Sequence, residues 1–205
     1  KRAMARDMAE VMDALGHERF HLVGHDRGAR VAHRLARDYG RRVRSLTVLD
    51  ISPTLKMYES TDKAFATAYY HWFFLIQKPP LPEKLLAGQV PHYILGRIGR
   101  GKSGLKHFSR EAQREYVRAF SDPRTIHATC EDYRAAATID LVHDRADVAR
   151  RIDCPVRVLW GERGVVHRLF TPVADWQAKC SGDVTGRVTP TGHYIPEEAP
   201  DLLAR

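Results

Sequence analysis

The pattern of apolar and polar residues at the start of the chain predicts a helix followed by a strand. Through residues 2–15, apolar side chains recur at helical spacing on one face, and Gly16 supplies a stop. The short apolar run Phe20 to Val23 is typical of a strand buried in a sheet. A turn flanked by glycines, Gly24 to Gly28, then leads into a second helix that ends near Gly40.

Later apolar runs complete the pattern of a parallel α/β sheet. Ser45 to Ile51 forms a second buried strand, so that strand, helix and strand alternate along the chain. From about residue 61 to residue 151 the pattern is helical and contains no convincing strand. Strand character returns at Val156 to Trp160 and near Val184 to Val188. The chain therefore combines a sheet with a helical insertion.

The domain boundaries follow from this change of pattern. We expect residues 1–57 and 151–205 to form the sheet domain and residues 58–150 to form the insertion. The chain opens on a helix rather than a strand and stops within an apparent helix, Glu197 to Arg205. We therefore expect both ends to be cut.

Composition excludes several classes of protein. The chain has 205 residues, of which 43% are hydrophobic and 28% charged, as in an ordinary globular domain. No apolar run approaches the ~20 residues that span a bilayer, so we expect no membrane partner. Cys130, Cys154 and Cys180 are odd in number and widely spaced, which argues against a disulfide scaffold. A reducing compartment, the cytoplasm, is the expected location.

The net charge of +8 must be tested before it is interpreted as nucleic-acid binding. Arginines recur every three or four residues through the helix after the glycine turn, on one face: Arg27, Arg30, Arg34, Arg37 and Arg41. We expect the last three to form a solvated outer face and the first two, in the first turn, to have a separate role. No nucleic-acid partner is expected.

The segment His17 to His21 fits the zinc-protease motif H-E-x-x-H. That motif works only on a helix, where residues four apart present two imidazoles to one metal ion. Here it follows the helix stop Gly16 and runs into a strand, where the two histidines are far apart. We reject it and expect no metal site.

A second match, Gly96 to Ser103, fits the phosphate-loop motif G-x-x-x-x-G-K-S. A phosphate loop requires a buried strand before it and an uninterrupted helix after it. Val90-Pro91-His92 makes a poor central strand, and Gly104 follows the motif at once. We interpret the segment as a glycine-rich surface loop and expect no nucleotide or other cofactor.

The turn Gly24 to Gly28 has the form of a nucleophile elbow, which lifts a reactive residue to the top of a sheet. Asp26 stands where ester hydrolases carry serine. A carboxylate is already an anion, so it is suited to displace a leaving group from carbon and form an ester on the enzyme. The alternative is that Asp26 only caps the helix and pairs with Arg30.

Hydrolysis of such an ester requires a histidine base and an acid that orients it. His193 lies in a loop after the last expected strand. It is therefore the last of the three residues along the chain, as the order nucleophile, acid, histidine requires. The acid has two candidates, Asp50 and Glu162, while Gly164 stands where such folds often keep an aspartate. We favour Asp50 because it ends the strand after the elbow strand, at the same sheet edge as Asp26.

Over nearly its whole length the chain resembles the haloacetate (fluoroacetate) dehalogenases of the α/β-hydrolase fold. The matching segments are Gly24 to Val31, Val48 to Ile51, Tyr70 to Trp72, Cys130 to Arg134 and Gly192-His193. The resemblance implies an α/β-hydrolase core with a helical cap, a small haloacid substrate and no cofactor. A homodimer would agree with it.

The resemblance also implies roles for particular side chains. Its residues are a nucleophile Asp26, a base His193 and its acid Asp50, a substrate-carboxylate clamp of Arg27 and Arg30, and a halide site of His71, Trp72 and Tyr133. The expected reaction converts a haloacetate such as fluoroacetate into glycolate and halide through an aspartyl ester. The aromatic residues could instead be simple cap core.

Two departures keep alternatives open. Haloalkane dehalogenases and epoxide hydrolases usually have tryptophan where Arg27 stands, and a guanidinium suits an anionic substrate. Epoxide hydrolysis remains an alternative, although no clear pair of cap tyrosines is present. The family's first strands and its His-Gly oxyanion loop are missing, so the strand at 20–23 should lie at an exposed sheet edge. A catalytically incomplete fragment is the third reading.

Overall fold

The computed structural model describes residues 1–100 and 104–204. Contacts divide the chain into two compact units. The sheet unit consists of Lys1–Thr61 and Thr138–Ile195, and the helical unit consists of Asp62–Ala137 and Pro196–Arg205. None of the helices in the described part of the chain has the length and apolar character that crossing a bilayer requires.

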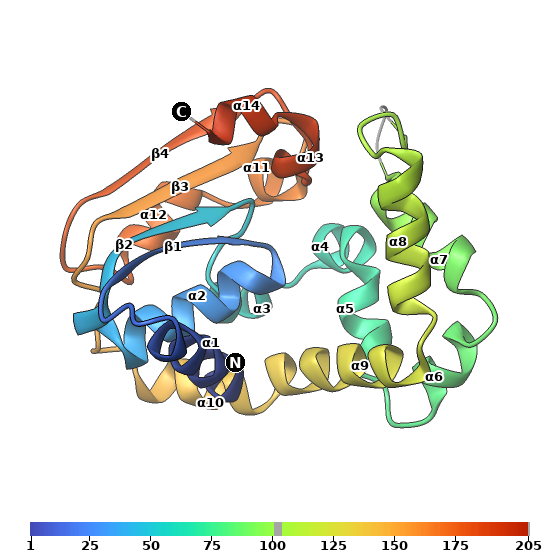
Figure 1. The fold of residues 1–205 in the computed structure, drawn as a ribbon, viewed down its shortest axis with the longest axis horizontal. Helices are drawn as coiled ribbons and strands as arrows, with labels where there is room; N and C mark the ends of the chain where they lie inside the picture. Colours follow the sequence, from blue (N-terminus) through green and yellow to red (C-terminus); the bar gives the residue numbers. More distant parts are fainter. Residues whose placement is uncertain (101–103, 205) are drawn as a thin grey trace. The chain divides into compact units, whose positions relative to one another are not determined.

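The sheet unit contains a four-stranded parallel sheet in the order β1-β2-β3-β4 (Figure 1). Its strands are β1 Phe20–His25, β2 Val43–Leu49, β3 Val156–Gly161 and β4 Val184–Thr189. All four lie where the apolar runs predict them. Strand β1 is at one edge of this sheet, as expected.

Helices α2 and α12 cover one face of the sheet. The helices of the sheet unit are α1 Arg2–Ala14, α2 Arg27–Asp38, α3 Thr54–Glu59, α10 Ile139–Ala146, α11 Val165–Leu169 and α12 Pro172–Gln177, with a 3₁₀ turn at Gly40–Arg42. Helix α2 packs on β1 and β2, and α12 packs on β3 and β4. The rings of His33 in α2 and Trp176 in α12 lie 4.9 Å apart, so both helices share this face. Apolar side chains such as Leu46, Val48 and Val158 fill the core between them and the sheet.

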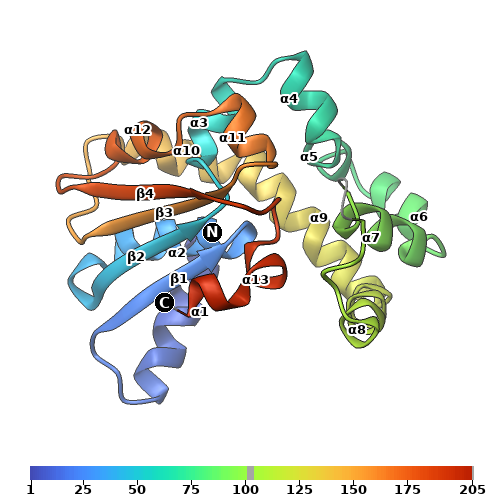
Figure 2. The ribbon, with the colours of Figure 1, turned by 90° about the horizontal axis from the view of Figure 1, so that it is seen from above.

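The described residues of the helical unit contain no strand, as the sequence predicts. Its helices are α4 Lys63–Ala68, α5 Tyr70–Leu75, α6 Leu81–Leu86, α7 Val90–Ile98, α8 Arg110–Phe120, α9 Pro123–Ala137 and α14 Pro200–Leu203, while α13 Ile195–Glu198 begins on the last residue of the sheet unit. Helices α5 and α6 pack on α9, and α7 packs on α8 (Figure 2).

The units differ from the expected boundaries at three places. The helical unit begins at Asp62 rather than at residue 58. Helix α10 belongs to the sheet unit, whereas the sequence-based boundary assigns it to the insertion. Arg34 of α2 ties the end of α10 to this unit, because its guanidinium lies 2.6 Å from the carboxylate of Asp147. Residues 196–205 group with the helical unit, where the Tyr116 hydroxyl donates to the Glu197 carboxylate.

The surface loop expected at Gly96 to Ser103 is partly wrong. Helix α7 extends to Ile98, so the first residues of the motif are helical. Pro91 is tolerated in its first turn because the amide that proline lacks has no helical partner there. Gly101, Lys102 and Ser103 lie outside the described residues.

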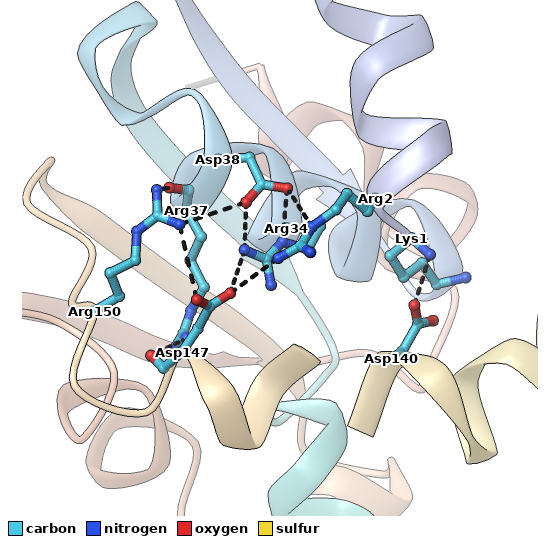
Figure 3. A network of polar contacts seen from close by, with 8 residues as sticks. All are labelled: Lys1, Arg2, Arg34, Arg37, Asp38, Asp140, Asp147 and Arg150. Carbon is cyan, nitrogen blue, oxygen red and sulfur yellow. Dashed lines mark hydrogen bonds and ion pairs between the residues drawn. The ribbon is translucent and has the colours of Figure 1, made fainter. Parts of the chain in front are cut away.

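The solvated face expected for the arginines of α2 is also wrong for Arg34 and Arg37, which are 3% and 5% exposed. Arg34 Nε donates to Asp38 Oδ2 at 2.9 Å, and its Nη2 contacts both Asp38 and Asp147 (Figure 3). Arg37 Nη1 donates to the main-chain oxygen of Asp147 at 2.6 Å. Carboxylates contributed by α2 itself and by the chain after α10 neutralise this face, while Arg41 is exposed as expected.

Replacement of Arg34 by methionine should destabilise the protein, because it removes the one buried member of the three arginines that contact both Asp38 and Asp147, and the half-exposed Arg2 and Arg150 compensate only in part. A buried ion pair that loses one member costs about 3–5 kcal/mol. Urea unfolding should report this loss, whereas Arg41→Met should change the unfolding free energy by no more than about 0.5 kcal/mol. Equal effects of the two substitutions would contradict the buried network.

Candidate active site

The turn between β1 and α2 holds Asp26 in a strained conformation. Its φ is 46° and its ψ is −117°, which are values that a residue with a side chain rarely adopts. Gly24 is required beside it, because a Cβ there would lie 2.6 Å from the Cα of Ala29. The sequence thus folds into the sharp strand-to-helix turn that the glycines predict, with Asp26 at the amino end of α2.

The Asp26 carboxylate makes no capping hydrogen bond to its helix, so the alternative role as a helix cap has no support in the geometry. Burial alone would raise its pKa. The hydrogen bond and charge of His193, together with the charges of Arg30 and His25, hold the pKa of Asp26 well below its usual range. Asp26 is therefore an anion over the whole neutral range.

His193 lies between two carboxylates. Its Nδ1 is 2.6 Å from Asp50 Oδ2, and its Nε2 is 3.5 Å from Asp26 Oδ2. Burial alone would lower the pKa of His193, but the hydrogen bonds and charges of Asp26 and Asp50 raise it to about 10. With both carboxylates charged, the imidazole carries two protons.

Asp50 follows β2 and is fully buried. The Gly161 amide donates to Asp50 Oδ1 at 3.0 Å, which fixes the carboxylate on the side away from His193. A Cβ on Gly164 would lie 3.1 Å from the same oxygen. Asp50 thus fills the space beside Gly164, the position at which such folds often carry an aspartate. The other candidate, Glu162, is exposed and bonded to Arg163 at 3.0 Å. Of the two candidate acids, Asp50 is thus the one that contacts His193.

The two arginines in the first turn of α2 differ in environment. Arg27 is half-buried, whereas Arg30 is 2% exposed. Arg30 Nη1 donates to the Ser52 carbonyl at 3.2 Å and to Thr54 Oγ1 at 3.0 Å, and its Nη2 lies 3.2 Å from the Met57 sulfur. These contacts hold the guanidinium rigidly near Asp26, whose pKa its charge lowers.

The three residues expected to bind halide gather within the helical unit. His71 and Trp72 lie on α5 and Tyr133 on α9, and all three are buried. The Tyr133 ring is 5.7 Å from that of His71 and 6.4 Å from that of Trp72. Arg97 Nη2 donates to His71 Nε2 at 3.1 Å. Because a guanidinium has no acceptor, the ring proton of His71 is on Nδ1.

Sequence reasoning passed over His25, the neighbour of Asp26. Its Nε2 donates to the main-chain oxygen of His193 at 2.7 Å, and the two rings lie 4.6 Å apart. Burial and the charge of His193 lower the pKa of His25. The sequence feature that indicates a role for His25 is its position directly before Asp26.

One group of side chains in the described residues has the spacing of a metal site. Single ligand atoms of Glu83, His127 and Glu131 lie within 4.8 Å of one another. Arg134 Nη1 is 2.7 Å from both glutamates, and hydrogen bonding to Arg134 lowers the pKa of Glu83 to about 2. A guanidinium thus occupies the position that a cation would take.

His21, from the rejected zinc motif, is on β1 and bonded to Ser45 at 2.7 Å.

Comparison with known proteins identifies the family of this chain. The model of the α/β hydrolase fold matches residues 1–200. A fluoroacetate dehalogenase of Burkholderia sp is 43% identical over 205 residues, which are 100% of this chain and 67% of that protein. A soluble epoxide hydrolase of Corynebacterium sp. is 31% identical, over 99% of this chain and 70% of that protein.

Solved structures agree with this relationship. A protein of Nostoc sp assigned to the α/β hydrolases has a TM-score of 0.96 and 53% identity, over 98% of this chain and 69% of its own. The epoxide hydrolase CorEH has a TM-score of 0.85 and 28% identity, over 98% of this chain and 71% of its own. The chain therefore belongs to the α/β-hydrolase family, and within it to the enzymes that are similar to haloacetate dehalogenases.

Proposed function

We propose that the enzyme hydrolyses the carbon–halogen bond of a short 2-haloacid, converting a haloacetate such as fluoroacetate into glycolate and halide. The observation that carries the proposal is an aspartate at the elbow, in contact with a histidine that a second carboxylate holds. The 43% identity to a fluoroacetate dehalogenase supports the same substrate class.

In the first step, an oxygen of Asp26 attacks the carbon that bears the halogen. The new carbon–oxygen bond forms as the carbon–halogen bond breaks, and the halide leaves with the bonding electron pair. The substrate carboxylate would repel Asp26. Arg27 and Arg30, which lie in the first turn of α2, offset that charge, and a guanidinium can bind a carboxylate through paired hydrogen bonds.

The departing halide needs hydrogen-bond donors in surroundings free of water. We assign this role to His71, Trp72 and Tyr133, which are buried together in the helical unit. Trp72 and Tyr133 can each donate one hydrogen through the indole nitrogen and the phenol oxygen. The Nδ1 proton that Arg97 imposes on His71 supplies a third donor.

In the second step, His193 takes a proton from water as the water oxygen attacks the carboxyl carbon of the Asp26 ester. The bond between that carbon and the glycolate oxygen then breaks. The freed oxygen takes the second proton of the attacking water, so glycolate leaves with its hydroxyl group and Asp26 returns to a carboxylate. His193 can act as a base only after its pKa falls. Ester formation removes the Asp26 charge that helps to raise this pKa, so the first step prepares the base for the second.

Epoxide hydrolysis is the second candidate, favoured by the 31% identity to a soluble epoxide hydrolase. An aspartyl ester serves both reactions, so the site carboxylates do not separate them. Arg27 favours the anionic substrate, because an uncharged epoxide gains nothing from a guanidinium at this position.

The described structure also bears on where such a reaction would run. Its three cysteines are free thiols, and burial raises the pKa of Cys130 and of Cys180 to about 11. We propose the reducing cytoplasm as the location, because the three cysteines are widely spaced and unpaired with one another. A homodimer stays a prediction.

Halide release tests the reaction and its nucleophile together. The parent enzyme should release halide from chloroacetate and fluoroacetate, and Asp26→Asn should lower this rate on the order of 10⁴-fold or more, because an amide cannot displace the halide. A halide electrode gives the rates, and Asp7→Asn on the exposed face of α1 is the control. Hydrolysis of a simple epoxide without halide release would favour the second candidate.

His193→Asn should stop the reaction after the first step. Asparagine does not accept the proton from water, so the aspartyl ester should persist once one equivalent of halide has been released. Mass spectrometry of the peptide that contains Asp26 should then show the added acid. A variant that is inactive and carries no adduct would assign His193 a structural role instead.

The pKa of His193 should depend on the charge of Asp26. In the parent it is about 10, above the ordinary value of 6.5, so the ring stays protonated through neutral pH and loses its proton only as the pH rises through about 10. Asp26→Asn removes one of the carboxylates, as the ester does, and should lower this pKa. Titration of the imidazole by NMR measures it, and an unchanged midpoint would exclude the coupling.

A further inference from the structure

The imidazole of His25 contacts His193, in the loop after β4, through two interactions. Its Nε2 lies 2.7 Å from the main-chain oxygen of His193, and its ring centroid lies 4.6 Å from that of His193 at an interplanar angle of 45°. The Tyr194 ring packs against both, at 5.8 Å from His25 and 4.9 Å from His193. His25 therefore contacts both the backbone and the side chain of the proposed base.

The direction of the hydrogen bond fixes the state of His25. A carbonyl oxygen only accepts, so Nε2 of His25 must carry a hydrogen. Burial and the charge of His193 lower the pKa of His25, which leaves its ring neutral beside the protonated His193. Asp26 and Asp50 act in the opposite direction but more weakly than these two effects together.

The hydrogen bond from His25 Nε2 holds the main chain of His193, the proposed base of the second step. The His193 ring must keep its 2.6 Å contact with Asp50 while its Nε2 turns from Asp26 to the attacking water. Its backbone lies in the loop after β4, where a neighbouring bond joins the Arg163 amide to the Thr191 carbonyl at 3.0 Å. The bond from His25 ties the loop to β1 instead, the strand that leads into the nucleophile.

We propose that His25 is a positioning residue for the His193 base, acting through its Nε2–H bond to the His193 carbonyl. The inference rests on the proposed function, since it concerns hydrolysis of the Asp26 ester. When Asp26 becomes an ester, the charge contact that helps to hold His193 is lost. The bond from His25 and the bond to Asp50 then define the direction of the imidazole.

Three variants separate this role from simple packing. His25→Phe keeps a ring but removes the donor, whereas His25→Gln has an amide N–H that reaches the position of Nε2. His21→Phe is the matched control, because His21 lies on the same strand and bonds to Ser45 instead of the loop. Rapid mixing with chloroacetate measures the first halide burst, and the decay of the aspartyl ester measures the second step.

The donor should matter for the second step alone. His25→Phe should slow ester hydrolysis about 10- to 100-fold, the range for a small misplacement of a catalytic group, while the burst keeps its rate. The ester should accumulate, and His25→Gln should restore most of the loss. Equal ester hydrolysis in His25→Phe and the parent would overturn the proposal, as would equal slowing of both steps in His25→Phe and His25→Gln.

A readout without turnover keeps this inference separate from the proposed reaction. The proton between His193 Nδ1 and Asp50 should give a far-downfield NMR signal in the parent. It should be unchanged in His25→Gln and His21→Phe, and shifted or broadened in His25→Phe. If the parent releases no halide, the dehalogenation proposal fails, while a signal in His25→Phe that is neither shifted nor broadened overturns the positioning role. If His25→Phe does not fold, His25→Asn, whose amide is too short to reach the carbonyl, replaces it.

Discussion

The contact of one imidazole with two carboxylates determines the arrangement of the candidate site. The parallel register pairs His25 of β1 with Leu49 of β2, so the next residues, Asp26 and Asp50, leave the sheet side by side. Both adopt positive φ, at 46° and 50°. Two negative charges at one sheet edge repel each other unless a cation lies between them. His193 is that cation, which is why its pKa is raised.

The main chains of Gly161 and Gly192 pack closely together beside this contact. A Cβ on Gly161 would overlap the main-chain oxygen of Gly192, the residue before His193. The missing side chain lets the His193 loop pack against Gly161, the last residue of β3, whose amide donates to Asp50. The geometry at His193 is therefore set by the His25 imidazole on its main chain, by the Asp50 carboxylate on its ring, and by the close packing of Gly161 against Gly192.

The fold and the core of the site could be predicted from sequence because their signals are local. Apolar runs mark the four strands, and the glycines around Asp26 mark a turn that only a small set of residues can form. Chain order and sheet topology then bring Asp50 to the same edge. The roles of the site residues go further than this geometry, and they stay proposals.

What the sequence did not indicate depends on partners far along the chain. Arg34 and Arg37 recur as a solvated stripe would, yet Arg37 bonds to the main chain of Asp147, a separation of 110 residues. Spacing alone cannot distinguish a face covered by water from one covered by a distant helix with matching carboxylates. The bond from His25 to His193 spans 168 residues and was missed for the same reason.

A count of formal charges links the two proposed steps. Asp26 and Asp50 bring two negative charges, which His193 and Arg30 balance, and Arg27 adds one positive charge for the substrate carboxylate. The loaded site is then neutral, so no unbalanced charge opposes binding. Loss of halide removes one negative charge and leaves Asp26 as a neutral ester, with an excess of one positive charge. The group that can relieve this excess at neutral pH is His193, because arginine keeps its proton. Departure of the halide thus makes deprotonation of the histidine favourable at the moment when a base is needed.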